Sequence, residues 1–302
     1  MRILFAYDGS AGADTACELL ASLPWDADTT VRVVTVVPDA ADVICGDPAA
    51  LEVKLAAAAA SALDVPRGRL ADRALSVDTD VLRGWRPAHA VAELAESWSA
   101  DLLVVGSRGL GAVGSGVLGS VSAEIVDVSP CSVLVTRTRV VRGIVLATDG
   151  SAQAGESERF LASFPVARHV PVRVVSVAHV IRAFGFVLRL PPPDVVHHGR
   201  SESGRPAKAS RAEIADATAT RLRSVGIETE SVVRSGDPAG EIIAVAEGSD
   251  TDLIVVGSRG QTGLRRIVLG SVARKVLYHA STSVLIVRGP READVAAAAP
   301  ED

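Results

Sequence analysis

The chain contains two copies of one sequence pattern. Residues 1–10, MRILFAYDGS, return as VRGIVLATDGS at 141–151, and the stretch at 101–120 returns at 252–271. Repeats of solenoid proteins have periods of about 20–50 residues, which is far shorter than this interval. A chain of 302 residues also has the length of two domains of roughly 150 residues each. We therefore predict a duplicated domain.

The predicted domains cover residues 1–139 and 140–290. The second copy is the longer one. We assign its extra length to an exposed loop at about 180–206, where the run PPPDVVHHGRSESGRP breaks any periodicity. Residues 291–302 show no core pattern, so we predict a flexible tail there.

Short runs rich in β-branched residues alternate with longer Ala-rich stretches in each copy. Continuous apolar runs such as LLVVG suit strands that are buried on both faces of a parallel sheet. The alternation predicts an α/β fold with two tandem flavodoxin-like or Rossmann-like domains, each a five-stranded parallel sheet with four flanking helices. The ligand of such a fold binds beyond the carboxyl ends of the strands. The predicted strands are 2–7, 30–37, 75–83, 101–106 and 132–137, then 142–147, 171–178, 228–235, 252–257 and 283–288. The predicted helices lie near 11–22, 48–63, 87–99 and 119–128, then 152–163, 207–224, 239–248 and 270–279.

Composition argues against several classes of protein. The net charge is −5 and the pI about 5.7, so we expect neither nucleic acid nor an anionic membrane as a partner. The apolar start of the chain stops at Asp8, which is too early for a secretory signal, and no apolar run approaches the ~20 residues of a membrane helix. Cys17, Cys45 and Cys131 show no metal-ligand spacing, so we expect free buried thiols in a reducing cytoplasm. The bias toward Arg over Lys suggests a GC-rich bacterial genome.

A glycine pattern follows the fourth predicted strand of each copy. In the first copy Gly106 and Gly109 precede Gly119 and Ser120, and the same spacing recurs in the second copy with Gly257, Gly260, Gly270 and Ser271. Glycines let backbone N–H groups approach an anion closely, and the helix that follows turns its free N–H groups and positive dipole end toward the same anion. Ser120 and Ser271 could add a hydroxyl to a phosphate or act as N-caps. The alternative is that the glycines only make tight turns, which the duplication copied.

This pattern resembles the universal stress protein family. The shared features are GSRG followed by GS, the strand-ending DGS at Asp8 and Asp149, and the closing runs SVLVTR and SVLIVR. In that family G-x2-G-x9-G-[ST] marks members that bind ATP. The resemblance covers both copies except for residues 180–206 and the tail.

The resemblance implies two nucleotide sites. Asp8 and Asp149 would contact the adenosine part, and Val36 and Val177 would lie against the adenine ring. The glycines and serines named above would surround ribose and phosphates, with Val121 and Val272 alongside. The alternative role for the two aspartates is an Asx-type cap on the next helix, and for the four valines it is core packing.

The stretch between the glycines differs between the copies. In the second copy it is QTGLRRIVL, whose Arg265 and Arg266 could reach a phosphate, whereas in the first copy it is the uncharged LGAVGSGVL. We therefore expect the first site to bind nucleotide more weakly. ATP is the expected ligand, with AMP or ADP as alternatives and Mg²⁺ on the phosphates.

No set of residues has the spacing of a catalytic triad or a metal site. The adjacent His197 and His198 fall in the Pro-rich insertion, where an exposed loop is the plainer interpretation than a metal site. The leading hypothesis is an ATP-binding regulatory protein of the stress response without substantial turnover. A slow ATPase or adenine-nucleotide hydrolase and a non-nucleotide protein-interaction module remain the alternatives.

The resemblance also implies a pairing of the two copies. Single-domain relatives commonly dimerise through their last strand, so 132–137 and 283–288 are expected to form an intramolecular pseudo-dimer, which closes two open sheet edges. A homodimer of whole chains is a further possibility.

Overall fold

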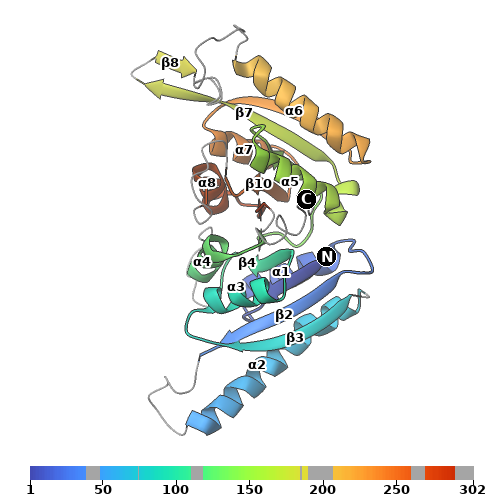
Figure 1. Ribbon diagram of the computed structural model, residues 1–302, viewed down its shortest axis with the longest axis vertical. Helices are drawn as coiled ribbons and strands as arrows, with labels where there is room; N and C mark the ends of the chain where they lie inside the picture. The colour runs from blue at the N-terminus through green and yellow to red at the C-terminus, as the bar shows by residue number, and fades with distance from the viewer. Residues whose placement is uncertain are drawn as a thin grey trace, which may run out of the picture. The chain divides into compact units, whose positions relative to one another are not determined.

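The computed structural model describes residues 1–38, 48–73, 75–109, 118–183, 186–189, 207–259 and 269–289. The chain divides into two compact units, which contain Met1–Val140 and Val141–Arg288 (Figure 1).

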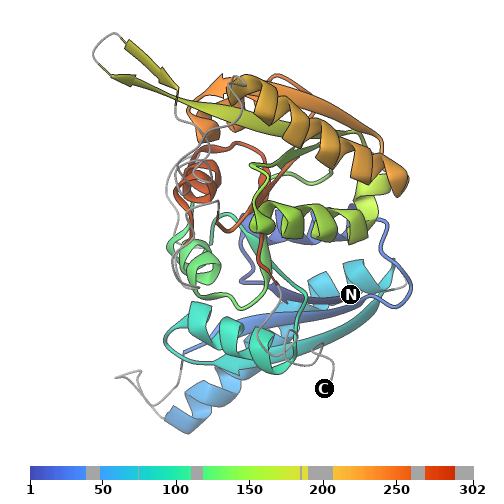
Figure 2. The same cartoon turned by 45° about the horizontal axis from the view of Figure 1, so that its top comes forward.

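The first unit is a parallel five-stranded sheet with helices on both faces. Its strands pair in the order β3-β2-β1-β4-β5. The helices α1 and α2 pack together on one face of the sheet, and α3 packs against α4 (Figure 2). The elements are β1 (Arg2–Ala6), α1 (Ala11–Ser22), β2 (Thr30–Val37), α2 (Pro48–Ala71), β3 (Ser76–Arg83), α3 (Pro87–Ser97), β4 (Leu102–Gly106), α4 (Ser120–Val128) and β5 (Ser132–Thr136).

The second unit repeats this arrangement. Its parallel strands pair in the order β9-β7-β6-β10-β11. The α/β fold predicted for both copies is therefore confirmed. The elements are β6 (Ile144–Ala147), α5 (Ala152–Ser163), a short 3₁₀ turn η2 (Pro165–Arg168), β7 (Val172–Ala183), β8 (Phe186–Arg189), α6 (Ala207–Ser224), β9 (Thr229–Gly236), α7 (Pro238–Glu247), β10 (Leu253–Gly257), α8 (Ser271–His279) and β11 (Ser283–Val287).

Each core is mainly aliphatic, in keeping with an aromatic content of 3%, and each contains one fully buried phenylalanine, Phe5 or Phe164. Strands β4, β5 and β11 are buried along their whole length, which explains their continuous apolar sequences. The expectation of buried free thiols is confirmed for Cys17 and Cys131, and burial raises the pKa of Cys17 to about 11. Cys45 lies outside the described residues.

Two predictions of local structure were wrong. Strand β7 continues through Ala183 and pairs antiparallel with β8, so 180–183 and 186–189 form a hairpin where the sequence suggested an irregular loop. Residues 190–206 and the predicted tail lie outside the described residues. Helix α2 extends beyond the predicted 48–63 to Ala71 and contains Pro66, because Leu63 and Leu70 on either side of it are buried in the core.

The described helices include none that is both long and apolar enough to cross a bilayer.

Candidate functional site

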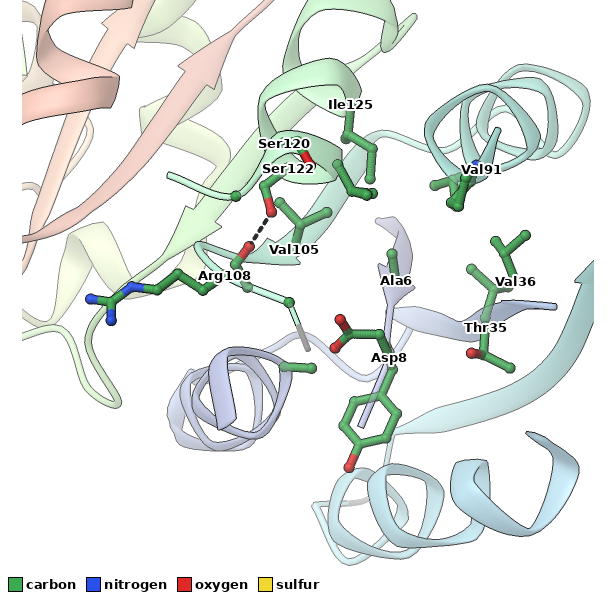
Figure 3. Close-up of a pocket in the computed structure, with 18 of the residues that line it drawn as sticks. Ala6, Asp8, Thr35, Val36, Val91, Val105, Arg108, Ser120, Ser122 and Ile125 are labelled. Carbon is green, nitrogen blue, oxygen red and sulfur yellow. Dashed lines mark hydrogen bonds between the residues drawn. The ribbon is translucent and has the colours of Figure 1, made fainter. Parts of the chain in front are cut away.

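A cavity of about 520 Å³ lies at the carboxyl end of the first sheet (Figure 3). Three strands end at it, and the N-terminal part of α4 forms another side. All seven residues of the first copy that the sequence singled out line this cavity: Asp8, Val36, Gly106, Gly109, Gly119, Ser120 and Val121. The structure thus gathers residues that are up to 113 positions apart in the chain (Asp8 to Val121).

Asp8 is held in place by a turn at the end of β1. The Ser10 N–H donates to Asp8 Oδ1 at 3.0 Å, and Gly9 between them has a φ of +75° that favours glycine. Ser10, and not Asp8, is the N-cap of α1, since the Ala13 N–H donates to its hydroxyl at 3.1 Å. The Asp8 carboxylate is exposed to solvent, so it is available to a ligand.

The loop after β4 is tied to the same turn. The Ser10 hydroxyl donates to the Arg108 carbonyl at 3.0 Å. A Cβ on Gly109 would lie 2.6 Å from Asp8 Oδ2, so the carboxylate occupies the space that a side chain at Gly109 would take. Ser10 and Gly109 therefore fix the distance between the end of β1 and the glycine loop.

Gly106 has a purely structural reason to be glycine. A Cβ there would lie 2.5 Å from the Gly12 carbonyl carbon and 2.8 Å from the Ala13 nitrogen, both in the first turn of α1. The close approach of β4 to α1 thus requires glycine whether or not a ligand binds. For this one position the tight-packing interpretation of the sequence is correct.

The N-terminus of α4 is set up differently from that of α1. Its N-cap is Gly119, and the described residues provide no side-chain hydrogen bond at this cap. Of the two roles suggested for Ser120, that of N-cap is excluded, because Ser120 is already the first helical residue. The N–H groups of the first turn have no acceptor within the helix, and the helix dipole makes this end positive. These groups border the cavity, which is the arrangement that binds anions.

A second contact fixes α4 against the end of β4. The Ser122 hydroxyl donates to the Gly106 carbonyl at 2.7 Å, and the Gly119 N–H donates to the Ser107 carbonyl at 2.8 Å. The N-terminal end of α4 is therefore held in one place. Figure 3 shows the Arg108 side chain extending away from Asp8, so the backbone of Arg108, and not its guanidinium, belongs to the cavity wall.

The opposite side of the cavity is apolar. Val36 from β2 and Val91 from α3 line it (Figure 3), and Ile125 from α4 and Ala6 at the end of β1 add further apolar surface to the cavity. Val121 is 43% exposed although it lines the cavity, so core packing does not account for this side chain. Val91 and Ile125 were not predicted from the sequence. The apolar spacing of their helices is consistent with side chains that face inward, but it does not indicate a cavity.

Two titratable groups near the loop, Arg137 and Tyr7, have shifted pKa values. Burial, and then the positive charge of Arg108, lower the pKa of Arg137 at the end of β5 to about 10. Burial and the hydrogen bond to Asp14 raise the pKa of Tyr7 to about 12, so this phenol stays protonated and donates to Asp14 at 2.9 Å.

Ion pairs join the two helices beside each site. In the first copy Arg86, which precedes α3, contacts Glu124 on α4 at 3.0 Å, and His89 contacts the same carboxylate at 3.2 Å. In the second copy Lys275 on α8 contacts Asp237, which precedes α7, at 3.2 Å. The polarity is thus reversed between the copies.

The second copy repeats the turn at the end of its first strand. The Ser151 N–H donates to Asp149 Oδ1 at 2.9 Å, Gly150 has a φ of +78°, and Ser151 caps α5. The Gly270 N–H donates to the Ser258 carbonyl at 2.8 Å, as in the first copy.

The rest of the predicted second site divides into two groups. Val177 is one of the last buried residues of β7, Gly257 ends β10, Gly270 is the N-cap of α8, and Ser271 and Val272 are its first residues. As with Ser120, the alternative role of Ser271 as the N-cap is therefore excluded. Gly260, Arg265 and Arg266 lie outside the described residues.

Comparison with known proteins matches this geometry to one family. A profile described as the Universal stress protein family matches residues 1–137 and 141–288. Universal stress protein MJ0531 of Methanocaldococcus jannaschii is 45% identical over 67 residues, or 22% of this chain and 39% of the relative. The universal stress protein in QAH/OAS sulfhydrylase 3'region of Thermus aquaticus is 36% identical over 144 residues, or 45% of this chain and 97% of the relative. This chain thus spans about two fifths of the length of the archaeal relative and nearly all of the Thermus one.

A solved structure agrees over most of the chain. A universal stress protein from Archaeoglobus fulgidus aligns with 95% of this chain and 98% of its own length, with a TM-score of 0.69 and 19% identity. This likeness shows the fold. The two profile matches, one on each copy, show that the chain belongs to the universal stress protein family.

Proposed function

We propose that the protein binds an adenine nucleotide in each copy, with ATP as the expected ligand and AMP or ADP as alternatives. The observation that supports this most strongly is the cavity of the first copy. There, a helix N-terminus without a side-chain cap among the described residues, an apolar wall and one carboxylate, that of Asp8, line the same cavity. A nucleotide has the matching parts, namely a phosphate chain, a flat apolar base and a ribose with hydroxyl donors.

Each part of the cavity has a role in this proposal. The N–H groups at the start of α4 and the Ser120 hydroxyl donate to phosphate oxygens. Asp8, which is an acceptor when ionised, receives the ribose hydroxyls. Val36, Val91 and Ile125 cover the faces of the adenine ring. The cavity volume of about 520 Å³ is within the range of about 300–1,000 Å³ that is usual for small-molecule sites.

We expect Mg²⁺ to enter with the phosphates. The described part of the chain has no group of three or more His, Cys, Asp or Glu side chains that could hold a metal ion. Mg²⁺ usually keeps several waters and binds through substrate phosphates and one or two carboxylates. Because Asp8 is assigned to the ribose, we expect phosphate oxygens and waters to hold the ion.

We further propose that occupancy of the sites, and not turnover, is the signal that a cytoplasmic partner reads in the stress response. Release of the bound nucleotide tests this. The purified protein is heat-denatured before and after incubation, and the supernatant is separated by ion-exchange chromatography. ATP that persists supports a regulatory protein, conversion to ADP or AMP supports a hydrolase, and absence of nucleotide contradicts the site.

A charge at the start of α4 tests the site itself. Ser120→Asp should keep or raise the melting temperature, because a carboxylate is favourable at a helix N-terminus, yet the same charge repels phosphate. We expect loss of ATP binding at the first site by at least about tenfold, or about 1.4 kcal/mol. Ser120→Ala is the matched control, and it should bind more tightly than the aspartate variant. Equal titrations for the two variants would mean that phosphate lies elsewhere.

A further inference from the structure

The two copies differ at the C-terminal end of the third helix of each unit. In the first copy Trp98 caps α3, and its ring lies 4.8 Å from the Arg32 guanidinium carbon, a cation–π contact with β2. Ser249 occupies the same position in the second copy, counted from the prolines that open α3 and α7. Arg173 on β7 stands where Arg32 stands on β2, and each faces an acidic residue on the edge strand, Glu230 or Asp78. The second copy thus keeps the cation and lacks the ring.

A groove is present where the ring is lacking. It has a volume of about 380 Å³ and is lined by Arg173, Glu230, Val232, Val233, Val245 and Ser249, among others. Ser249 does not fill it, because its hydroxyl turns back to the end of α7, where it donates to the Val245 carbonyl at 2.7 Å and contacts the Thr251 hydroxyl at 2.8 Å. Short side chains therefore leave this space open.

We propose that this groove binds a small aromatic molecule of about the size of indole, with its ring stacked on Arg173. The side chain of Arg173 is 30% exposed, and Glu230 holds its Nε at 3.4 Å, so the guanidinium is oriented while part of it remains accessible. Valines from β9 and α7 supply an apolar surface for the ring. The first copy shows that this scaffold accepts an indole ring over an arginine at this position.

The groove is separate from the nucleotide sites. Arg173 is the second residue of β7, and Ser249 follows the C-terminal end of α7, whereas the nucleotide cavity lies at the carboxyl ends of the strands. The proposal therefore stands independently of ATP binding, and its test uses no nucleotide.

The test is a titration of the full chain with indole, followed by backbone amide signals in two-dimensional NMR spectra. We expect saturable shifts at Val245, Gly248, Ser249 and the start of β9. Cyclohexanol, which lacks a π-system, should cause none of them. Arg173→Met should weaken indole binding about two- to fivefold, the size of an exposed cation–π contact of about 0.5–1 kcal/mol.

Two reciprocal variants complete the test. Ser249→Trp places in the second copy the ring that the first copy already has, so it should abolish the shifts. Trp98→Ser should lower the melting temperature and open a second groove over Arg32, and indole should restore part of that loss. Absence of saturable shifts in the wild type would overturn the proposal. So would shifts that persist unchanged in Ser249→Trp, or a Trp98→Ser variant whose melting temperature indole leaves unaltered.

Discussion

The three glycines of the first loop have three different surroundings. Gly106 meets the backbone of α1, Gly109 meets the Asp8 carboxylate, and a Cβ on Gly119 would make only ordinary contacts, the nearest at 3.4 Å from the Arg108 Cα. Backbone atoms cannot move aside, whereas a carboxylate can rotate. Gly106 therefore allows close packing against α1, Gly109 leaves room for the Asp8 carboxylate, and Gly119 begins α4 as its N-cap.

Alanine substitutions should separate these roles. Gly106→Ala forces a Cβ into the α1 backbone and should cost about 1–3 kcal/mol of stability, the usual range for overpacking. Gly109→Ala should leave the melting temperature nearly unchanged and weaken ATP binding, because it displaces Asp8. Urea unfolding and calorimetric titration measure the two effects. A Gly109→Ala protein that binds ATP as well as wild type would show that Asp8 has no part in the site.

Some residues that line the cavity of the first copy could be predicted from the sequence, and others could not. Asp8 and Val36 were named through the resemblance to the universal stress protein family, and they meet because Asp8 follows β1, Val36 lies near the end of β2, and parallel strands end together at one edge of a sheet. Val91 and Ser122 belong to helices in which small and apolar residues are common. Their places at the cavity depend on how α3 and α4 lie on the twisted sheet, which no short-range pattern specifies.

The repeated DLLVV and DLIVV runs carry a structural link at the start of the fourth strand. Asp252 accepts the backbone N–H of Arg142 at 2.9 Å, and its carboxylate takes two further bonds from the Arg142 guanidinium at 2.9 and 3.0 Å. Asp101 accepts the backbone N–H of Arg2 at 2.6 Å in the first copy. In each unit this aspartate links the start of the first strand, β1 or β6, to the start of the neighbouring fourth strand, β4 or β10.

The stability of the second unit should depend on pH through Asp252. Burial alone would raise the pKa of Asp252, but the hydrogen bonds and charge of Arg142 outweigh burial and lower it. The stabilisation is therefore complete above the ordinary carboxyl value of about 3.9 and is lost as the pH falls through the lowered pKa. Asp252→Ala should cost about 1.5–3 kcal/mol at neutral pH, as for hydrogen bonds to a charged group.

Calorimetry in acid checks this expectation. Asp252→Asn keeps an acceptor for the Arg142 N–H but cannot titrate, so its melting temperature should fall less steeply with acid than that of the wild type. Parallel acid profiles for the two proteins would assign the acid sensitivity to other carboxylates.

Element types were predictable from the sequence wherever the periodicity was strong, and element ends were not. Continuous apolar strands such as β4 and β10 fall where the sequence predicted them. The hairpin of β7 with β8 was missed because its partner segment directly precedes the run of three prolines, which suggests a loop. The length of α2 was missed because Pro66 suggests a stop, whereas burial of Leu63 and Leu70 outweighs the lost hydrogen bond.

At the scale of the whole molecule, duplication offers two sites that need not be equal. In the first copy the Ser122 hydroxyl bonds α4 to the end of β4, whereas its counterpart on α8 of the second copy is Ala273. Arg265 and Arg266, in contrast, occur only in the loop of the second copy. The pairing of the two copies through their last strands stays a prediction.

We predict that the second site binds ATP more tightly and that its affinity falls more steeply with salt. A charge-assisted bond from an arginine is worth about 1.5–3 kcal/mol, or roughly a tenfold to hundredfold gain in affinity. Titration of Ser120→Asp leaves the second site to be measured, and Ser271→Asp leaves the first. Arg265→Met with Arg266→Met is the control, and it should bring the second site close to the first. Equal ATP affinities in Ser120→Asp and Ser271→Asp would show that the two sites do not differ.

The reversed ion pairs beside the two sites also bear on how the chain assembles. During folding, α4 can meet α7 in place of α3, and α8 can meet α3 in place of α7. Because all four helices belong to one chain, they meet at an effective concentration in the millimolar range. Such encounters are a usual cause of misassembly in tandem repeats. Exchange of the two helices would bring Arg86 to Lys275 and Asp237 to Glu124, so that both wrong pairs repel where both native pairs attract. The charge reversal thus favours the native helix pairs over the exchanged ones.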